Sequence, residues 1–266
     1  MEAPNESYSS WCCRMRKTGW RAWVLLLLAF LVTLVVMAPA TLLAKIVEEG
    51  SEGKFVLANA TGTMWRGSAI PAIRQLTGGL FVLEKLHWDM SMLPLLRGKA
   101  SIEFRWDNIE QIQPVLATVS YGRIELRNVI VPLHAGILGE LSPLLRPVQL
   151  SGKMQISSES FTISKQGMSG TVVADWMNAG SVLSSVNPLG SYRINVVAAG
   201  ERLDATLATT AGVLMLEGRG NFTLGRGLNF KGTARASEDS RGSLNELLGN
   251  LGPESSPGVH TFNLMQ

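Results

Sequence analysis

Three histidines, His87, His134 and His260, are the residues in this chain of 266 that most readily suggest metal or acid–base chemistry. None stands four residues from another, the spacing that places two imidazoles on one helix face for zinc. The cysteines, Cys12 and Cys13, are adjacent and far from every histidine, so they complete no metal-binding pattern. The sequence therefore predicts no metal site and no cofactor.

The acidic residues give no catalytic pair either. Asp89, Glu103, Asp107 and Glu110 are close in sequence, but on alternating strands we expect opposite faces to scatter them over a charged solvent surface. No nucleophile elbow and no phosphate-binding loop occurs. The glycines in residues 218–227 lie between strand patterns with no helix after them, which indicates hairpin turns. We expect no catalytic or cofactor-binding residue, and hence no enzyme.

Composition excludes a further class of function. The formal net charge is +3, and 17% of residues are charged. Much of the positive excess lies near the N-terminus, and no basic stripe with interleaved aromatic residues follows, so we expect no nucleic-acid partner. The tryptophans Trp65, Trp88, Trp106 and Trp176 are typical of strand packing, and a carbohydrate- or peptide-binding platform is the alternative interpretation.

An uncharged, Leu- and Val-rich run covers residues 22–44. As a helix it would be roughly 34 Å long, enough to cross a hydrocarbon core of about 30 Å. Arg14, Arg16, Lys17 and Arg21 precede it, whereas Lys45 is the flanking base on the far side. This asymmetry predicts a single-pass anchor at residues 20–44, with the N-terminus in the cytoplasm and the C-terminal part exported.

The competing interpretation is a cleaved signal peptide, since Ala38-Pro39-Ala40 loosely resembles a cleavage site. The run is too long for the apolar core of such a peptide, which covers about 7–15 residues. We therefore divide the chain into a cytoplasmic tail (1–19), a transmembrane helix (20–44), a linker (45–52) and an exported domain (53–266). The exported domain contains no cysteine, so it must be stabilised by apolar burial rather than disulfides.

Period-2 alternation dominates the exported domain. Ile102, Phe104 and Trp106 alternate with polar residues, and the same pattern recurs at residues 123–127, 148–156, 192–198, 203–209 and 228–236. One apolar and one polar face per strand predicts antiparallel sheets with one solvated side. The predicted fold is all-β, either a curved sheet or a sandwich, with one N-terminal transmembrane helix and a short C-terminal helix.

That C-terminal helix is predicted at residues 243–251. Ser243 and Glu246 fit a capping box, and leucines at 244, 247, 248 and 251 follow helical spacing before Gly252 and Pro253. We expect these leucines to cover one end of the sheet, although a partner-binding helix is the alternative. An internal duplication is also suggested, because residues 61–64 resemble residues 151–154 and each is followed by a tryptophan.

Several of these segments together resemble protein N of the bacterial type II secretion system. The resemblance lies in residues 62–69, 86–88 and 95–98, then in Trp176, 187–192, 216–220, 230–232 and 244–252. It covers most of residues 55–264, and the order of the segments carries it rather than any single motif. The resemblance implies an inner-membrane component of the machinery that moves folded proteins from the periplasm across the outer membrane, with no catalytic residues.

Two functional hypotheses follow. The first is a structural or assembly role in such a secretion system, with the anchor among inner-membrane subunits and sheet edges open to periplasmic partners. The second is a lipid-handling protein of the envelope with an apolar groove in an open sheet.

Overall fold

The computed structural model describes residues 16–74, 79–107, 113–141, 146–223 and 225–265, and its main body is one antiparallel sheet of 15 strands. The first strands are β1 (Phe55–Gly62), β2 (Arg66–Arg74), β3 (Leu80–Val82), β4 (Leu86–Ser91), β5 (Lys99–Trp106), β6 (Val115–Ser120) and β7 (Arg123–His134). The others are β8 (Leu150–Ser164), β9 (Gly167–Ser181), β10 (Gly190–Gly200), β11 (Arg202–Gly212), β12 (Leu214–Thr223), β13 (Gly227–Ala236), β14 (Glu254–Ser256) and β15 (Val259–Met265).

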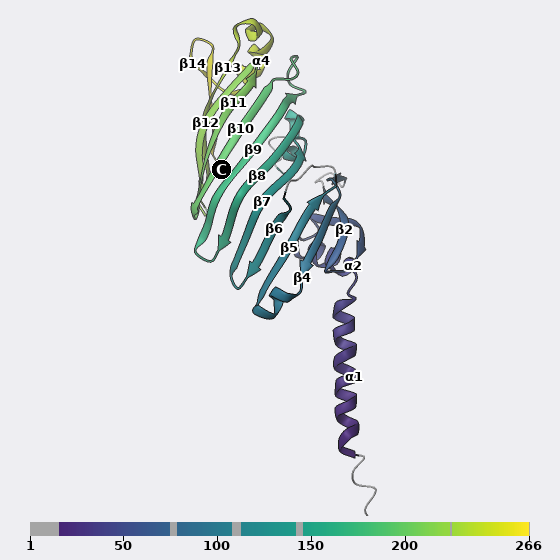
Figure 1. The fold of residues 1–266 in the computed structure, drawn as a ribbon. Coiled ribbons are helices and arrows are strands. Elements are labelled where there is room, and N and C mark those ends of the chain that lie inside the picture. The colour runs from purple at the N-terminus through teal and green to yellow at the C-terminus, as the bar shows by residue number, and fades with distance from the viewer. Residues whose placement is uncertain (1–15, 75–78, 108–112, 142–145, 224, 266) are drawn as a thin grey trace, which may run out of the picture.

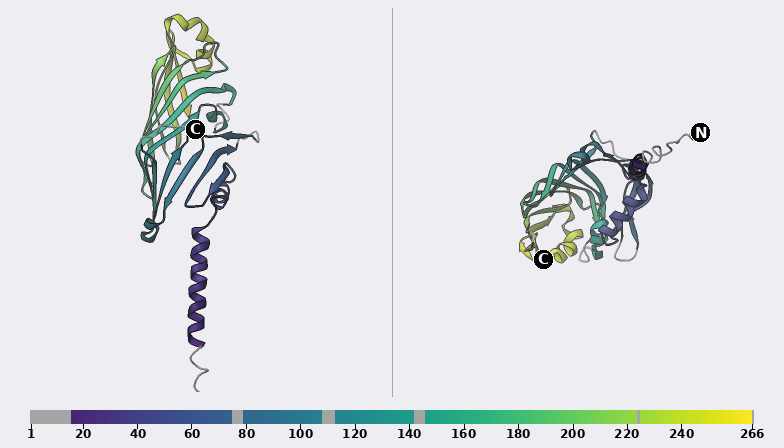
Figure 2. Two further views of the ribbon diagram at one scale, coloured as in Figure 1. Left: turned by 45° about the vertical axis from the view of Figure 1, so that its right-hand side comes forward. Right: turned by 90° about the horizontal axis from the view of Figure 1, so that it is seen from below.

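Almost every strand pairs with its neighbours in sequence, in the order β1-β2-β4-β5-β6-β7-β8-β9-β10-β11-β12-β13-β15-β14, with β3 paired to β2. No pairing between the two ends of this order occurs among the described residues, so the sheet is open. Figures 1 and 2 show it as a long twisted sheet that curves into an arc. The all-β prediction is confirmed, with a single curved sheet in place of a sandwich.

The alternation read from the sequence separates two faces across the sheet. One row of register partners runs through eight strands: Val131, Ile156, Ala174, Ile194, Leu207, Gly218, Gly232 and Phe262. The neighbouring row through Gln155, Asp175 and Arg193 is polar. We call the first side the inner face and the second side the outer face.

The two faces stay separate because irregularities in adjacent strands coincide. Asn128 in β7 has a positive φ of 52°, a backbone conformation that Asn tolerates better than most residues. Opposite it, the pairing of β8 with β9 shifts by one residue between Ser157 and Phe161. The alternation of side chains between the two faces therefore shifts by one residue in both strands at the same place. As a result, apolar residues face inward on either side of the break.

The uncharged N-terminal run forms two helices rather than the single predicted helix over 20–44. Helix α1 (Arg16–Val36) ends before Pro39, and helix α2 (Ala40–Gly50) begins directly after it, as expected for a residue that cannot continue a helix from the preceding turn. Residues 45–52, predicted as a linker, are thus mostly helical. In the described part of the chain, no helix is both long and apolar enough to qualify as a membrane span.

Helix α4 (Arg241–Leu251) confirms the predicted C-terminal helix and its apolar side. Leu244, Leu247 and Leu248 are buried against Leu214 and Ala234 of the inner face. The capping box is wrong: the helix begins two residues earlier, at Arg241, and Ser240 at its N-cap makes no side-chain cap hydrogen bond. Ser243 therefore lies inside the first turn and cannot cap it.

Tyr192 links the middle of the sheet to this core. Its hydroxyl donates a hydrogen bond to the Leu214 carbonyl over 3.0 Å, and its ring lies 5.7 Å from that of Trp176. The side chain is only 2% exposed. Desolvation by burial raises the pKa of Tyr192 well above its ordinary value, because the phenolate has no charged partner there.

We predict that Leu244→Ala lowers the free energy of unfolding by about 2–5 kcal/mol, because Leu244 is fully buried and its removal leaves a cavity under α4. Urea denaturation measures this loss. Glu246→Ala, on the exposed side of the same helix, should stay within about 0.5 kcal/mol of the unchanged protein. Equal losses in the two variants would contradict the packing of α4 on the sheet.

We predict that Tyr192→Phe costs roughly 1–3 kcal/mol near neutral pH, because it leaves the Leu214 carbonyl unpaired. The raised folded-state pKa also gives a pH dependence. Its contribution is fully present below the unfolded-state pKa of about 10 and is lost as the pH rises above it. Urea titrations across this alkaline range should show the unchanged protein losing more stability than Tyr192→Phe. Parallel losses would show that Tyr192 ionises freely in the folded state.

Candidate functional site

The inner face presents an extended apolar surface across the middle of the sheet. Its side chains in the middle of the sheet are apolar and half-buried rather than sealed by a second layer. The set comprises Leu126, Val131, Ile156, Val172, Ala174, Ile194, Val196, Ala205 and Leu207. Adjacent valines of β10 show the difference between the faces: Val196 is half-buried, whereas Val197 on the outer face is 49% exposed. An apolar surface of this extent is a candidate binding surface.

A helix covers the inner face at each end of the sheet. Near the N-terminus, Ala40 and Leu43 of α2 pack with Ala69 and Trp88 in one cluster. At the other end, α4 packs on β12, β13 and β15. Within the described residues, neither cluster includes a side chain of β6 to β11. Met154 and Tyr192 are nevertheless buried on this face, and the half-buried apolar part between the two helices is here called the trough.

Glycines shape the inner face of β12 and β13, next to the trough. The ring of Phe230 lies against Gly218 and Gly220 of β12, where an added Cβ would approach it to 2.5 Å. Phe262 lies against Gly232 in the same way, at 2.3 Å. Gly218 and Gly220 were predicted in hairpin turns, but they lie inside β12. They make room for aromatic rings that lie flat on the sheet.

The junction between α1 and the sheet was not predicted from the sequence. The Trp65 indole donates a hydrogen bond of 2.8 Å to the Val35 carbonyl near the end of α1. The Met64 amide donates one of 2.8 Å to the Ala38 carbonyl, and Pro39 forms a bridge with Thr63. The β1–β2 turn therefore holds the end of α1. A lone tryptophan in a turn gives no sequence signal for such a role.

The acidic residues lie differently from the prediction. Asp89 and Glu103 are direct cross-strand partners and so share the outer face, because both β4 and β5 keep an unbroken alternation there. Asp89 pairs with Arg66, Glu103 with Arg105, and Asp107 with His87. Each carboxylate is thus matched by its own basic group, which gives a charged ladder and no acid–base pair. Glu110 lies outside the described residues.

Other outer-face charges follow the same pattern. Arg193 makes two hydrogen bonds to Asp175, of 2.6 and 3.2 Å, and the hydrogen bond and charge of Asp175 raise the pKa of the Arg193 guanidinium. Exposed ion pairs of this kind contribute little to stability. Their effect is to keep the outer face solvated, in contrast to the inner face.

The histidines are not brought together. His87 lies on the outer face of β4, His134 ends β7, and His260 bonds to the Gly252 carbonyl over 2.8 Å. Among the described residues, no three His, Cys, Asp or Glu side chains form a group that could hold a metal ion. Cys12 and Cys13 lie outside the described residues.

A hollow of about 1340 Å³ lies across β11, β12, β13 and β15. Its lining combines Glu217, Arg219 and Lys231 of the outer face with residues of the row from Leu207 to Phe262 and with residues 251–253 at the end of α4. It is open to solvent, and its lining mixes charged and apolar side chains. The trough carries no charged side chain in the middle of the sheet and is therefore the better candidate for an apolar partner.

The suggested duplication does not give equivalent strand units. Residues 61–64 lie at the β1–β2 turn, whereas residues 151–154 lie within β8. The tryptophans do share one contact: the Trp88 indole donates to the Met64 carbonyl and the Trp176 indole to the Ser151 carbonyl, over 3.1 and 3.0 Å. All four tryptophans of the sheet thus make backbone hydrogen bonds, since Trp106 donates to the Ile130 carbonyl.

Comparison with known proteins supports the resemblance that the order of the sequence segments indicated. The family described as type II secretion system (T2SS), protein N, matches residues 54–263. A type II secretion system protein N from Pectobacterium carotovorum subsp. carotovorum is 24% identical over 253 residues, which cover 93% of this chain and 96% of that protein. No solved structure matches. Because the family match extends over nearly the whole sheet, this chain belongs to the type II secretion system protein N family.

Proposed function

We propose that this type II secretion component has a structural or assembly role, in which its sheet binds other subunits of the apparatus. The observation that carries the proposal is the trough, an apolar face between β6 and β11 that neither helix cluster includes and whose central side chains are half-buried. Apolar patches of this kind mark interaction surfaces in proteins that function in assemblies.

We propose further that α1 is a single-pass anchor in the inner membrane, with residues 1–19 in the cytoplasm and the sheet in the periplasm. Its large apolar side chains from Trp20 to Val36 are 44–75% exposed on all sides of the helix. A helix that is apolar all round is typical of burial in a protein core or a membrane. The basic residues before it favour this orientation.

The edge of β15 supports the assembly role. The Thr261 amide bonds to Pro253, on the side away from β13, over 2.9 Å. By strand alternation the amide and carbonyl of Asn263 point the same way, and no described residue bonds to them. A partner strand could pair along this edge through backbone hydrogen bonds.

We predict that Val196→Asp impairs secretion of folded exoproteins when it replaces the chromosomal copy, because a carboxylate in the trough would have to be desolvated by an apolar partner. The measurement is exoprotein in the culture medium, with the abundance of the variant checked by immunoblot. Val197→Asp, next to it on the outer face, is the matched control and should secrete normally. If the Val196→Asp strain, the Val197→Asp strain and a deletion strain all secrete the same amount of exoprotein, the proposal is contradicted.

We predict that Asn263→Pro removes a crosslink between this edge and another secretion subunit, while Asn263→Ala keeps it. Proline deletes the outward N–H but leaves the bonds to β13 intact. A photo-crosslinker at Met265 in living cells, followed by mass spectrometry of the products, provides the measurement. Retention of the same crosslink with proline would show that the edge does not pair with a partner strand.

The trough also favours a second function, the handling of lipids in the envelope. The trough is several strands wide and its central side chains are apolar. It could therefore accommodate acyl chains as well as an apolar protein segment. The domain from Ala38 onward retains α2 on the inner face, so it can be purified without detergent and analysed by native mass spectrometry. A stoichiometric lipid would favour this function, and a folded domain with no bound lipid would exclude it.

A further inference from the structure

We propose that the turns at the α1 end of the sheet form a surface that binds anionic lipid headgroups of the membrane next to the anchor. The surface, here called the proximal rim, consists of Leu95, Arg97, Lys99, Tyr121, Arg123 and Lys165. This inference rests on the proposed anchoring of α1, and it adds the face that meets the bilayer and the lipid class involved.

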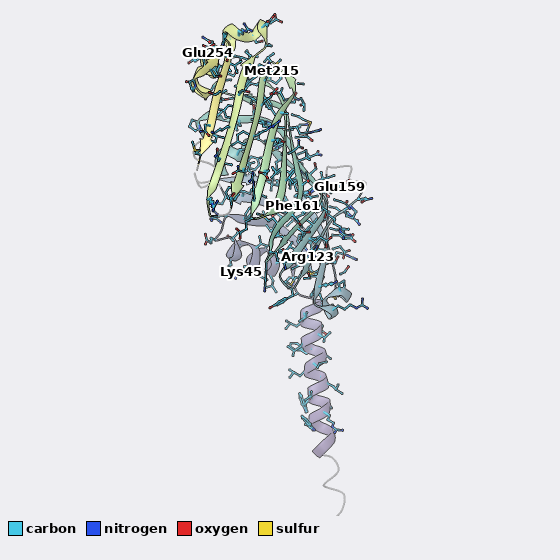
Figure 3. All side chains as sticks on the ribbon, turned by 90° about the vertical axis from the view of Figure 1, so that its left-hand side faces the viewer. Lys45, Arg123, Glu159, Phe161, Met215 and Glu254 are labelled. Atoms are coloured by element: carbon cyan, nitrogen blue, oxygen red, sulfur yellow. The ribbon has the colours of Figure 1, made fainter. Side chains whose placement is uncertain are left out.

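The connectivity places these residues at one end of the sheet. β4, β6 and β8 all run toward α1, so the turns that follow them lie at the same end: the 3-10 turn Leu93–Arg97, the β6–β7 turn and the β8–β9 turn. Figures 1 and 2 show the β4–β5 connection level with the upper end of α1. Figure 3 places Arg123 toward the same end.

The orientation of the sheet relative to α1 is held by the junction described above. Hydrogen bonds from Trp65 and Met64 fix the end of α1 to the β1–β2 turn. β1 also runs toward α1, so this turn lies at the same end of the sheet as the proximal rim. A bilayer around α1 would therefore lie below the rim rather than below the opposite end, which carries α4.

The six rim residues carry only positive charge, and Glu201 in the neighbouring β10–β11 turn is the acidic residue next to them at this end. Residues 92–99, 121–123 and 165–167 contain no acidic residue. Arg97, Lys99, Arg123 and Lys165 are exposed, and none makes an ion pair within the described residues. This differs from the outer face, where Arg66, Arg105, Arg127, Arg193 and Arg202 are each matched by a carboxylate. Unpaired bases beside a membrane attract anionic headgroups.

Apolar and aromatic side chains accompany these bases. Tyr121 is 94% exposed, and the Lys165 ammonium lies 4.7 Å from the centre of its ring. Leu95 is 38% exposed, and Ile124 and Ile163 at the adjacent end of the trough are 39% and 40% exposed. An exposed tyrosine among bases and aliphatic groups is typical of surfaces that sit at the headgroup level. Such a contact would bring the open end of the trough to the membrane.

The test uses the full chain in proteoliposomes, with Cys12→Ser and Cys13→Ser so that a single introduced cysteine carries a fluorophore. Gln166→Cys places the label at the rim, and Asp239→Cys places it at the opposite end near α4. The readout is quenching by a nitroxide attached to lipid headgroups. Bilayers of phosphatidylcholine alone are compared with bilayers that also contain phosphatidylglycerol.

We expect quenching at residue 166 but not at residue 239, stronger with phosphatidylglycerol and weaker at high salt. Each base near an anionic surface is worth about fivefold in affinity, so Arg97→Glu with Arg123→Glu should reduce the contact more than tenfold. Lys231→Glu with Arg235→Glu, on the outer face of β13, changes the net charge equally and should leave quenching unchanged.

Three results would overturn the proposal: no quenching at residue 166, equal quenching at both labels, or quenching that is unchanged by phosphatidylglycerol and by the charge reversals. A crosslink from residue 166 to another subunit in cells, without quenching, would assign the rim to a protein partner instead. Flotation of the proteoliposomes reports separately on the anchor. Chains that float but show no contact refute only the rim, whereas chains that fail to float refute the anchoring itself.

Discussion

The separation of one apolar face from one polar face over the whole sheet is the constraint on which the other features depend. A shift of one residue in a single strand would turn its side chains to the opposite face. The break at Asn128 is tolerated because the β8–β9 pairing shifts beside it. Because the two shifts coincide, the apolar and polar faces stay separate. The trough, the matched charges of the outer face and the packing of α2 and α4 on the inner face all depend on this separation.

Much of this arrangement could be predicted from alternation in the sequence. The strands around Ile102, Ile124, Tyr192, Leu203 and Leu228 were identified with the correct faces, and so was the apolar side of α4. These segments have local patterns that set their conformation. The same patterns do not say whether an apolar face meets another sheet, a helix or nothing, and so sandwich and open sheet could not be separated.

The errors have physical causes of the same kind. Asp89 and Glu103 were expected on different faces, but register depends on which residues pair, and pairing is not visible in either strand alone. Gly218 and Gly220 resembled turn residues, yet their small size serves Phe230 on the next strand. The uncharged run over residues 22–44 was read as one helix because composition outweighed Pro39, which ends α1 early and lets α2 bind the sheet. In each case the deciding contact is distant in sequence.

The pairing of strands with their sequence neighbours has an evolutionary consequence. In such a linear array each strand touches only the next one, so stability is approximately a sum of local contributions. Two strands joined by a turn could be gained or lost in the middle without reversing the direction of the rest. Relatives of different length could then keep the same terminal helices while the span between them grows or shrinks in hairpin steps.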